Sequence, residues 1–330
     1  MCAAAAVWAA GSRLAMSVDA IARKLRIGPA FAGMLLLGGI TSLPELATVT
    51  TSSITGNASL AINNLLGSVA VNVLLLAAAD IVFGRGALTS VVAKPATLMQ
   101  GVLGMMLLGM VSMIIISGDY PLFGVGVGSI IVAVGALLAI RIAASFEQRE
   151  VWQPAEDAEG QSDGEGEERK DPRSLRRLVL ITSGLGLLIL VAGIALSQSA
   201  DAIATKTGIS SGMVGFVLVS FATSLPELSS IITAVREKRY ELAVGDIFGT
   251  NLFNLILLLV ADAVASGGPV LGSAGTFEAL GALLAVLMTG CFTVGVLERK
   301  DRTVWRMGYD AVGALVLFGA GMLVMARFAQ

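Results

Sequence analysis

The sequence predicts an all-α membrane protein with ten transmembrane helices, arranged as two inverted-topology five-helix repeats. Three observations carry this prediction: the apolar composition, ten separate apolar runs and an internal repeat. Of the 330 residues, 55% are apolar and only 14% are charged, and the mean hydropathy is +0.84. A soluble core cannot bury so large an apolar fraction, whereas a lipid bilayer can cover it.

Ten apolar runs are long enough to cross the hydrocarbon layer of a bilayer as helices. The first is the weakest, because it is short and contains Arg13; a truncated helix and an uncleaved signal-like segment both stay open for it. The predicted spans are 1–22, 29–55, 59–82, 89–117, 121–144, 176–204, 210–235, 241–264, 274–297 and 305–328.

The distribution of basic residues predicts the orientation. With the N-terminus outside, nineteen of the 22 Lys and Arg face the cytoplasm, and the exceptions are Arg13, Lys206 and Arg327. Positive charges collect on the cytoplasmic side of membrane proteins, so the opposite orientation is disfavoured. We therefore expect a multi-pass protein of the cell membrane, surrounded by lipid.

A charged connection divides the chain. Residues 146–175 are rich in acidic residues and nearly free of large apolar ones, which is typical of a disordered linker, here on the cytoplasmic side. The segment lacks the spacing of an EF-hand, so a solvated linker fits it better than a calcium-binding regulator. The predicted transmembrane halves are 1–145 and 176–330.

The chain contains an internal repeat. Residues 17–80 align with 199–262 without a gap and share 24 identities in 64 positions. Five predicted spans, an odd number, separate equivalent points, so the second copy crosses the membrane in the opposite sense to the first. Inverted repeats of this kind place a substrate site near the bilayer midplane, between the copies. The aligned segments end at Asp80 and Asp262, for which a helix-capping role and a functional role both stay open.

The sequence TSLPEL occurs once in each copy, inside an apolar run. Pro44 and Pro226 lack the backbone N–H that a helix interior needs, so each predicts a broken helix. A break at membrane depth frees carbonyl oxygens, which are hard ligands of the kind that Na+ and Ca2+ prefer. Glu45 and Glu227 follow the prolines. Because a carboxylate in hydrocarbon is costly unless a partner compensates it, this symmetric pair predicts a bound cation.

The next apolar run of each copy adds oxygen ligands. Asn64 and Asp246 lie 19 residues after the two glutamates, and a glycine that permits close helix approach follows each three positions later. Carboxylate, amide, hydroxyl and carbonyl oxygens together suit a hard cation. The candidate ligands are Glu45, Glu227, Asp246, Asn64, Thr41, Ser42, Thr223, Ser224, Ser68 and Thr250.

TSLPEL followed by GD-x-x-G-[ST]-N-x-x-N resembles the signature of the two alpha repeats in sodium/calcium exchangers of the prokaryotic type, within the cation/calcium antiporter superfamily. The resemblance covers both repeats. It implies exchange of Ca2+ for Na+ over four adjacent cation sites, with Glu45 and Glu227 central and Asn64 and Asp246 flanking. It also implies that the first and sixth helices slide across a fixed core. Further hydroxyl or carbonyl ligands are implied at Thr41, Ser42, Thr223 and Ser224.

The first repeat departs from the motif, so one wall of the predicted site lacks expected polar groups. The coupling ion therefore stays open, since members of the same superfamily exchange Ca2+ for protons or require K+. The departures, first copy against second, are Asn63 for Gly245, Val69 for Asn251 and Gly38 for Ser220.

Other classes of protein fit less well. A cation channel would explain the acids but gives no reason for inverted symmetry, and an intramembrane enzyme would need a nucleophile and a base that the sequence does not offer. The chain has no histidine, and Cys2 and Cys291 lie far apart, which disfavours zinc, haem and a disulfide framework. We expect no prosthetic group, no nucleic-acid partner, and a monomer that binds Ca2+ and Na+ as transported ions.

Overall fold

The computed structural model describes residues 2–84, 86–92, 94–146, 172–298, 303–304 and 307–328, and most of these residues are helical. The unbroken helices of the first half are α1 (Cys2–Leu25), α5 (Ala58–Phe83), α6 (Leu88–Val91), α7 (Pro95–Ser117) and α8 (Val127–Phe146). Those of the second half are α9 (Leu175–Thr207), α13 (Tyr240–Val264), η3 (Leu271–Ser273), α14 (Thr276–Glu298) and α15 (Tyr309–Met325). Two short antiparallel hairpins precede α8 and α15: β1 (Pro121–Leu122) with β2 (Val125–Gly126), and β3 (Thr303–Val304) with β4 (Met307–Gly308).

One helix in each half is assembled from short pieces. The axis bends by 47° in the first half and by 42° in the second. Pro44 and Pro226 lie in the first turn of the piece after each bend, where a missing N–H costs nothing, so the predicted breaks are present. The pieces of the first are α2 (Pro29–Ala32), the π-helical η1 (Gly33–Leu37), α3 (Gly38–Thr41) and α4 (Leu43–Ile54). Those of the second are α10 (Ser211–Met213), the π-helical η2 (Val214–Val219), α11 (Ser220–Thr223) and α12 (Leu225–Arg236).

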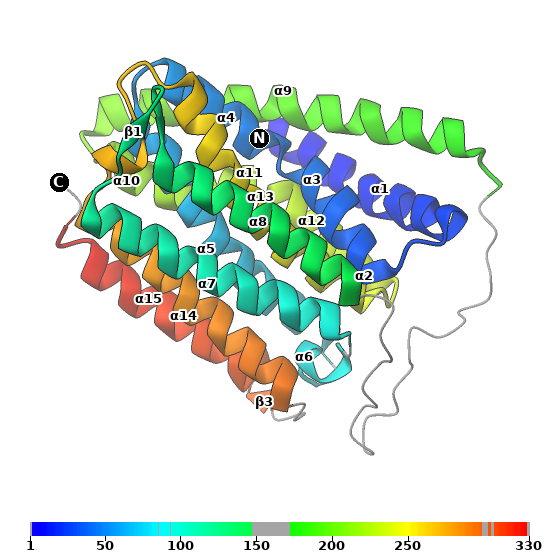
Figure 1. The fold of residues 1–330 in the computed structure, drawn as a ribbon. Helices are drawn as coiled ribbons and strands as arrows, with labels where there is room; N and C mark the ends of the chain where they lie inside the picture. Colours follow the sequence, from blue (N-terminus) through cyan, green and yellow to red (C-terminus); the bar gives the residue numbers. More distant parts are fainter. Residues whose placement is uncertain are drawn as a thin grey trace.

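Two central helices, α5 and α13, pack against each other and against both broken helices (Figure 1). The long α9 and α1 lie together along one side of the molecule, with α9 against α4 and α1 against α12. On the opposite side, α14 lies between α7 and α15. This arrangement encloses the bends of the two broken helices.

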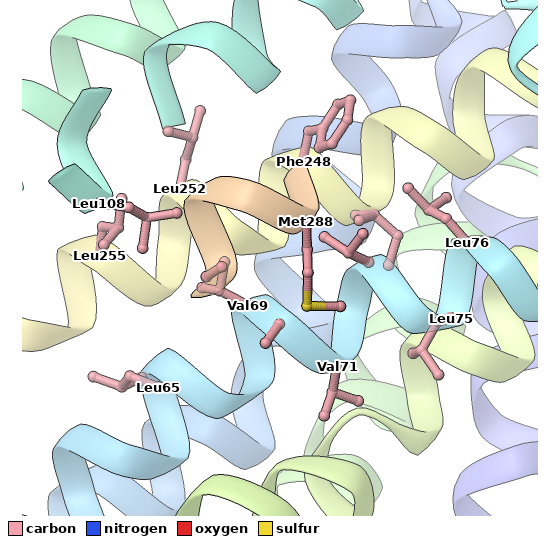
Figure 2. Close-up of a cluster of buried hydrophobic side chains, with 14 of the residues drawn as sticks. Leu65, Val69, Val71, Leu75, Leu76, Leu108, Phe248, Leu252, Leu255 and Met288 are labelled. Carbon is pink, nitrogen blue, oxygen red and sulfur yellow. The ribbon is translucent and has the colours of Figure 1, made fainter. Parts of the chain in front are cut away.

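Apolar residues on every side of α5 and α13 form the core, as expected for helices with no solvent-facing surface. Figure 2 shows part of this cluster, in which Val69 and Val71 of α5 join Leu252 of α13, Leu108 of α7 and Met288 of α14. The five side chains are at most 1% exposed. Such close packing makes α5 and α13 a rigid support for the polar residues that they carry.

A carboxylate at the end of each central helix holds the neighbouring connection. Asp80 in α5 and Asp262 in α13 each accept hydrogen bonds from two backbone N–H groups. The donors are Leu88 and Gly308 for Asp80, and Val270 and Gly126 for Asp262. Donors and acceptors of the two sets are related by the 182-residue offset of the sequence repeat. Both carboxylates therefore serve the backbone, which favours the structural reading left open above.

By length and apolar composition, six helices in the described part of the chain can cross a membrane, or up to eight if each bent pair is one span. Helix α1 and the 17-residue α15 lie at the first and last predicted spans. A helix or broken helix thus lies at each predicted position, while the number that cross the bilayer stays a prediction. The linker predicted at 146–175 lies almost wholly outside the described residues, and it too stays a prediction.

Candidate functional site

The two helix breaks bring the predicted ligands to the middle of the protein. Ser42 and Ser224, the residues at the breaks, have ψ angles of 2° and 9° instead of helical values. The next turn, at the start of α4 and α12, carries Glu45 and Glu227, both 0% exposed. Thr41 and Thr223 end α3 and α11, directly before the breaks. Helices α5 and α13 pack against these turns and carry the other four predicted ligands. All ten predicted residues are buried, with exposures of 0% to 4%.

Hydroxyl groups beside each break reach across to the other repeat. Thr41 Oγ1 lies 3.4 Å from Asp246 Oδ1, and Thr223 Oγ1 lies 3.3 Å from Asn64 Oδ1. Each threonine has the same place in its repeat, and so has each acceptor. The structure therefore joins the two copies of the motif into one cluster.

A second pair of contacts extends this symmetry. Thr41 Oγ1 lies 3.4 Å from Thr250 Oγ1, and the equivalent pair, Thr223 and Ser68, is also separated by 3.4 Å. Ser68 Oγ additionally donates to Glu45 Oε1 over 3.2 Å. Hydroxyl oxygens therefore lie beside the carboxylates and offer further neutral ligands.

Three of the four oxygens of the central glutamates have no hydrogen-bond partner among the described residues: Glu45 Oε2 and both oxygens of Glu227. Glu227 is close enough to Glu45 and Asp246 for their charges to interact. Thr41 is also near Glu227, but the geometry between them does not meet that of a hydrogen bond. Ser42 Oγ donates to Gly38 O over 2.6 Å, which leaves it less available than the other hydroxyls. The site thus concentrates carboxyl groups and leaves three of their oxygens without a protein partner among the described residues, an arrangement that favours a cation.

Two glycines allow the close approach of helices that the cluster needs. A Cβ on Gly67 of α5 would lie 2.3 Å from Phe216 O, and one on Gly249 of α13 would lie 2.4 Å from Met34 Cα. The predicted role of these glycines is therefore confirmed. Each central helix touches the π-helical turn of the other repeat at this point, and any side chain would force them apart.

The structure adds polar contacts that sequence reasoning missed, and two of them involve Ser230 and Asn72, which were not among the residues singled out. Ser230 Oγ donates to Asp246 Oδ2 over 2.5 Å, and Ser220 Oγ donates to Asn64 O over 3.0 Å. Asn72 Nδ2 donates to Asn251 Oδ1 over 2.9 Å where α5 and α13 cross. Ser230 follows Glu227 by three positions on one helix, so its spacing was the signal that could have found it.

The chemistry of the cluster is that of oxygen ligands. Within the described ranges, no three Cys, Asp or Glu side chains lie close enough together to form a metal cluster. The carboxylates are instead separated by hydroxyl and amide groups. Neutral and charged oxygens in such a mixture bind hard cations less tightly than an all-carboxylate cage does.

The fold is shared with a solved transporter. The sodium-calcium exchanger NCX_Mj, in a crystal soaked with Na+ and Sr2+, matches with a TM-score of 0.67 over 97% of this chain and 95% of that chain. The two sequences are 18% identical. At this identity the match shows the fold alone.

Two relatives have higher sequence identity to this chain. CaxA of Alkalimonas amylolytica, named provisionally as an antiporter, is 26% identical over 302 residues, which are 90% of this chain and 89% of that protein. Inner membrane protein YrbG of Escherichia coli is 27% identical over 269 residues, covering 78% and 76%. The model of the sodium/calcium exchanger protein family matches residues 1–140 and 178–326. The chain therefore belongs to the sodium/calcium exchanger protein family.

Proposed function

We propose that the protein is a secondary active antiporter that exchanges Ca2+ for Na+ across the cell membrane by alternating access. One observation carries the proposal: Glu45 and Glu227 are fully buried after symmetric helix breaks, with three of their oxygens unpaired among the described residues. An unpaired carboxylate in a membrane interior is costly, and a bound cation removes that cost. Membership of the exchanger family supports Ca2+ and Na+ as the cations.

The proposed ions bind between the repeats. Glu45 and Glu227 are the central ligands, and Asn64 and Asp246 flank them. Because transported ions must also leave, a mixed set of charged and neutral oxygens suits the task better than a cage of carboxylates. The remaining proposed ligands are Thr41, Ser42, Thr223, Ser224, Ser68 and Thr250.

Ten spans in two inverted repeats would let one site face either side of the membrane. The matched contacts of Thr41 and Thr223 support this, because equivalent parts of the two halves meet around one centre. In this proposal α1 and α9, the first and sixth spans, slide across α5 and α13. The N-terminus lies outside and the connection at 146–175 lies in the cytoplasm.

Counter-transport in proteoliposomes tests the proposal. The purified protein is reconstituted, the vesicles are loaded with Na+, K+ or a proton gradient, and uptake of radioactive Ca2+ is followed. We expect Na+ inside the vesicles to accelerate Ca2+ uptake. Acceleration by protons alone would assign the chain to H+/Ca2+ exchange, and a requirement for K+ would assign it to K+-dependent exchange. A rate of Ca2+ uptake that does not depend on any ion inside the vesicles would identify a channel.

A further inference from the structure

Three hydroxyl groups of α4 lie buried beyond the proposed site. Thr48, Ser52 and Ser53 are 0%, 2% and 1% exposed, and their hydroxyls have no hydrogen-bond partner among the described residues. A helical Ser or Thr can bond to the carbonyl one turn back, as Thr51 does to Ala47 O over 2.8 Å. The three hydroxyls do not use this partner, so they are left to interact with something else.

These hydroxyls lie between Glu45 and the far end of α4. Thr48 and Ser52 follow Glu45 by three and seven positions, so Glu45, Thr48 and Ser52 share one face of α4. Seven residues of helix span about 10 Å. Ile54, the residue after Ser53, is 58% exposed. The polar row therefore leads from the buried Glu45 to Ser52, and Ser53 on the neighbouring face lies directly before the exposed end of the helix.

The second repeat lacks such a row. The equivalents of the three hydroxyl residues, 182 positions later, are Ser230, Ala234 and Val235. Ser230 is occupied, because it donates to Asp246 Oδ2 over 2.5 Å, and the other two are apolar and at most 4% exposed. Thr233 bonds to its own helix over 2.7 Å, just as its counterpart in α4 does. The two repeats therefore differ on the face that leads to the carboxylate.

We propose that Thr48, Ser52 and Ser53 line the route by which ions reach Glu45 from the outer side of the membrane. This inference rests on the proposed antiport and on the N-outside orientation, which places the end of α4 outside. Hydroxyl oxygens replace part of the hydration shell of a hard cation, and buried hydroxyls without protein partners favour water or ions. The equivalent face of α12 offers no such ligands beyond Ser230, so the outer and inner routes are chemically different.

Single-cysteine labelling tests the route. In a parent with Cys2→Ser and Cys291→Ser, the Ser52→Cys variant is treated with a membrane-impermeant cationic thiol reagent in right-side-out and inside-out vesicles. We expect reaction at least about tenfold faster from the outer side, a difference of about 1.4 kcal/mol in barrier, and slower reaction when Ca2+ is added. Ala234→Cys, at the equivalent position of α12, is the matched control and should not react from the outer side.

Several outcomes overturn the inference: no reaction of Ser52→Cys from either side, reaction from the inner side alone, or equally fast outer labelling of Ala234→Cys. Labelling does not require flux, so it separates this inference from the antiport proposal. If exchange is normal but Ser52→Cys does not react, only the proposed route is contradicted. If the parent shows no exchange, the antiport proposal is contradicted. As a second variant, Ser52→Val should slow Ca2+ uptake from the outer side, and Ser52→Thr should restore it; equal rates in Ser52→Val and the parent count against the route.

Discussion

Thr41 and Asp246 lie 3.4 Å apart across the boundary between the repeats, and their counterparts Thr223 and Asn64 lie 3.3 Å apart. The geometry is nearly the same, but the acceptor is charged in one contact and neutral in the other. A hydroxyl near a carboxylate interacts more strongly than one near an amide. The hydrogen bonds of Thr41 and Thr223 should therefore differ in strength, and this difference can be measured.

The first prediction compares Thr41→Val with Thr223→Val. The hydrogen bond to a charged acceptor is worth about 1.5 kcal/mol and the neutral one about 0.5 kcal/mol, so Thr41→Val should weaken apparent Ca2+ affinity roughly tenfold and Thr223→Val about twofold. Concentration dependence of Ca2+ uptake gives both values. Thr51→Val, whose hydroxyl bonds to its own helix, is the control and should change little. Equal losses at Thr41 and Thr223 would contradict the argument.

The second prediction concerns the central glutamates. Glu45→Gln and Glu227→Gln keep the size of the side chain but remove the charge that every transported ion shares. Each variant should lose Ca2+ uptake by at least tenfold, because a charged ligand is worth about 1.5–3 kcal/mol. Size-exclusion profiles should stay monodisperse, since glutamine has the size of glutamate and its amide oxygen can still accept the hydrogen bond that Ser68 donates to Glu45. Near-parental uptake by either folded variant would remove that glutamate from the site.

The third prediction changes a flanking ligand. Asn64 is neutral where Asp246 is charged, and Asn64→Asp would add a fourth carboxylate to the cluster. Like charges in a confined site make protons stronger competitors with metal cations. Ca2+ uptake by this variant should therefore depend more steeply on pH than uptake by the parent, measured between mildly acidic and mildly alkaline buffers. An unchanged pH profile would mean that Asn64 does not face the ions.

Residues with strong backbone constraints made the helix breaks predictable. Pro44 and Pro226 disrupt a helix interior, so the sequence predicted both bends. Gly67 has no side chain beyond a hydrogen atom, so it predicted a close contact between helices. The π-helical turns at Gly33–Leu37 and Val214–Val219 had no such signal, because no residue type requires a π-helix.

Contacts between distant segments were the harder part of the site. The contact of Ser230 with Asp246 depends on how α12 is rotated against α13, and that rotation follows from packing around the bend. The meeting of Asn72 with Asn251 likewise depends on where α5 crosses α13. A repeat in the sequence names equivalent residues, but it does not say which of them touch.

The fourth prediction tests the carboxylates at the ends of the central helices. Asp80→Asn and Asp262→Asn each replace an acceptor of two backbone N–H groups, so each should lower the free energy of unfolding by about 1.5–3 kcal/mol. Thermal unfolding in detergent measures the loss. Asp19→Asn is the control: it weakens ion pairs with Arg23 at 2.8 Å and Arg239 at 3.6 Å, both partly exposed arginines, and should cost less, about 1 kcal/mol. Ion preference should not change, because neither Asp80 nor Asp262 lies in the proposed site.

The fifth prediction is that exchange is electrogenic, and it follows from the charge of the proposed site. When ions are bound and the carboxyls of Glu45, Glu227 and Asp246 are all ionised, the site holds three negative charges, which three Na+ neutralise but one Ca2+ does not. A cycle that trades these two loads moves one net charge. One charge crossing 100 mV changes the driving force by about 2.3 kcal/mol, which is close to fiftyfold in the equilibrium gradient. The measurement is the Na+ gradient that just halts net Ca2+ flux, repeated at several clamped potentials. A balance point that moves with potential supports three-for-one exchange, and one that stays constant identifies electroneutral exchange of two Na+ or two protons for each Ca2+.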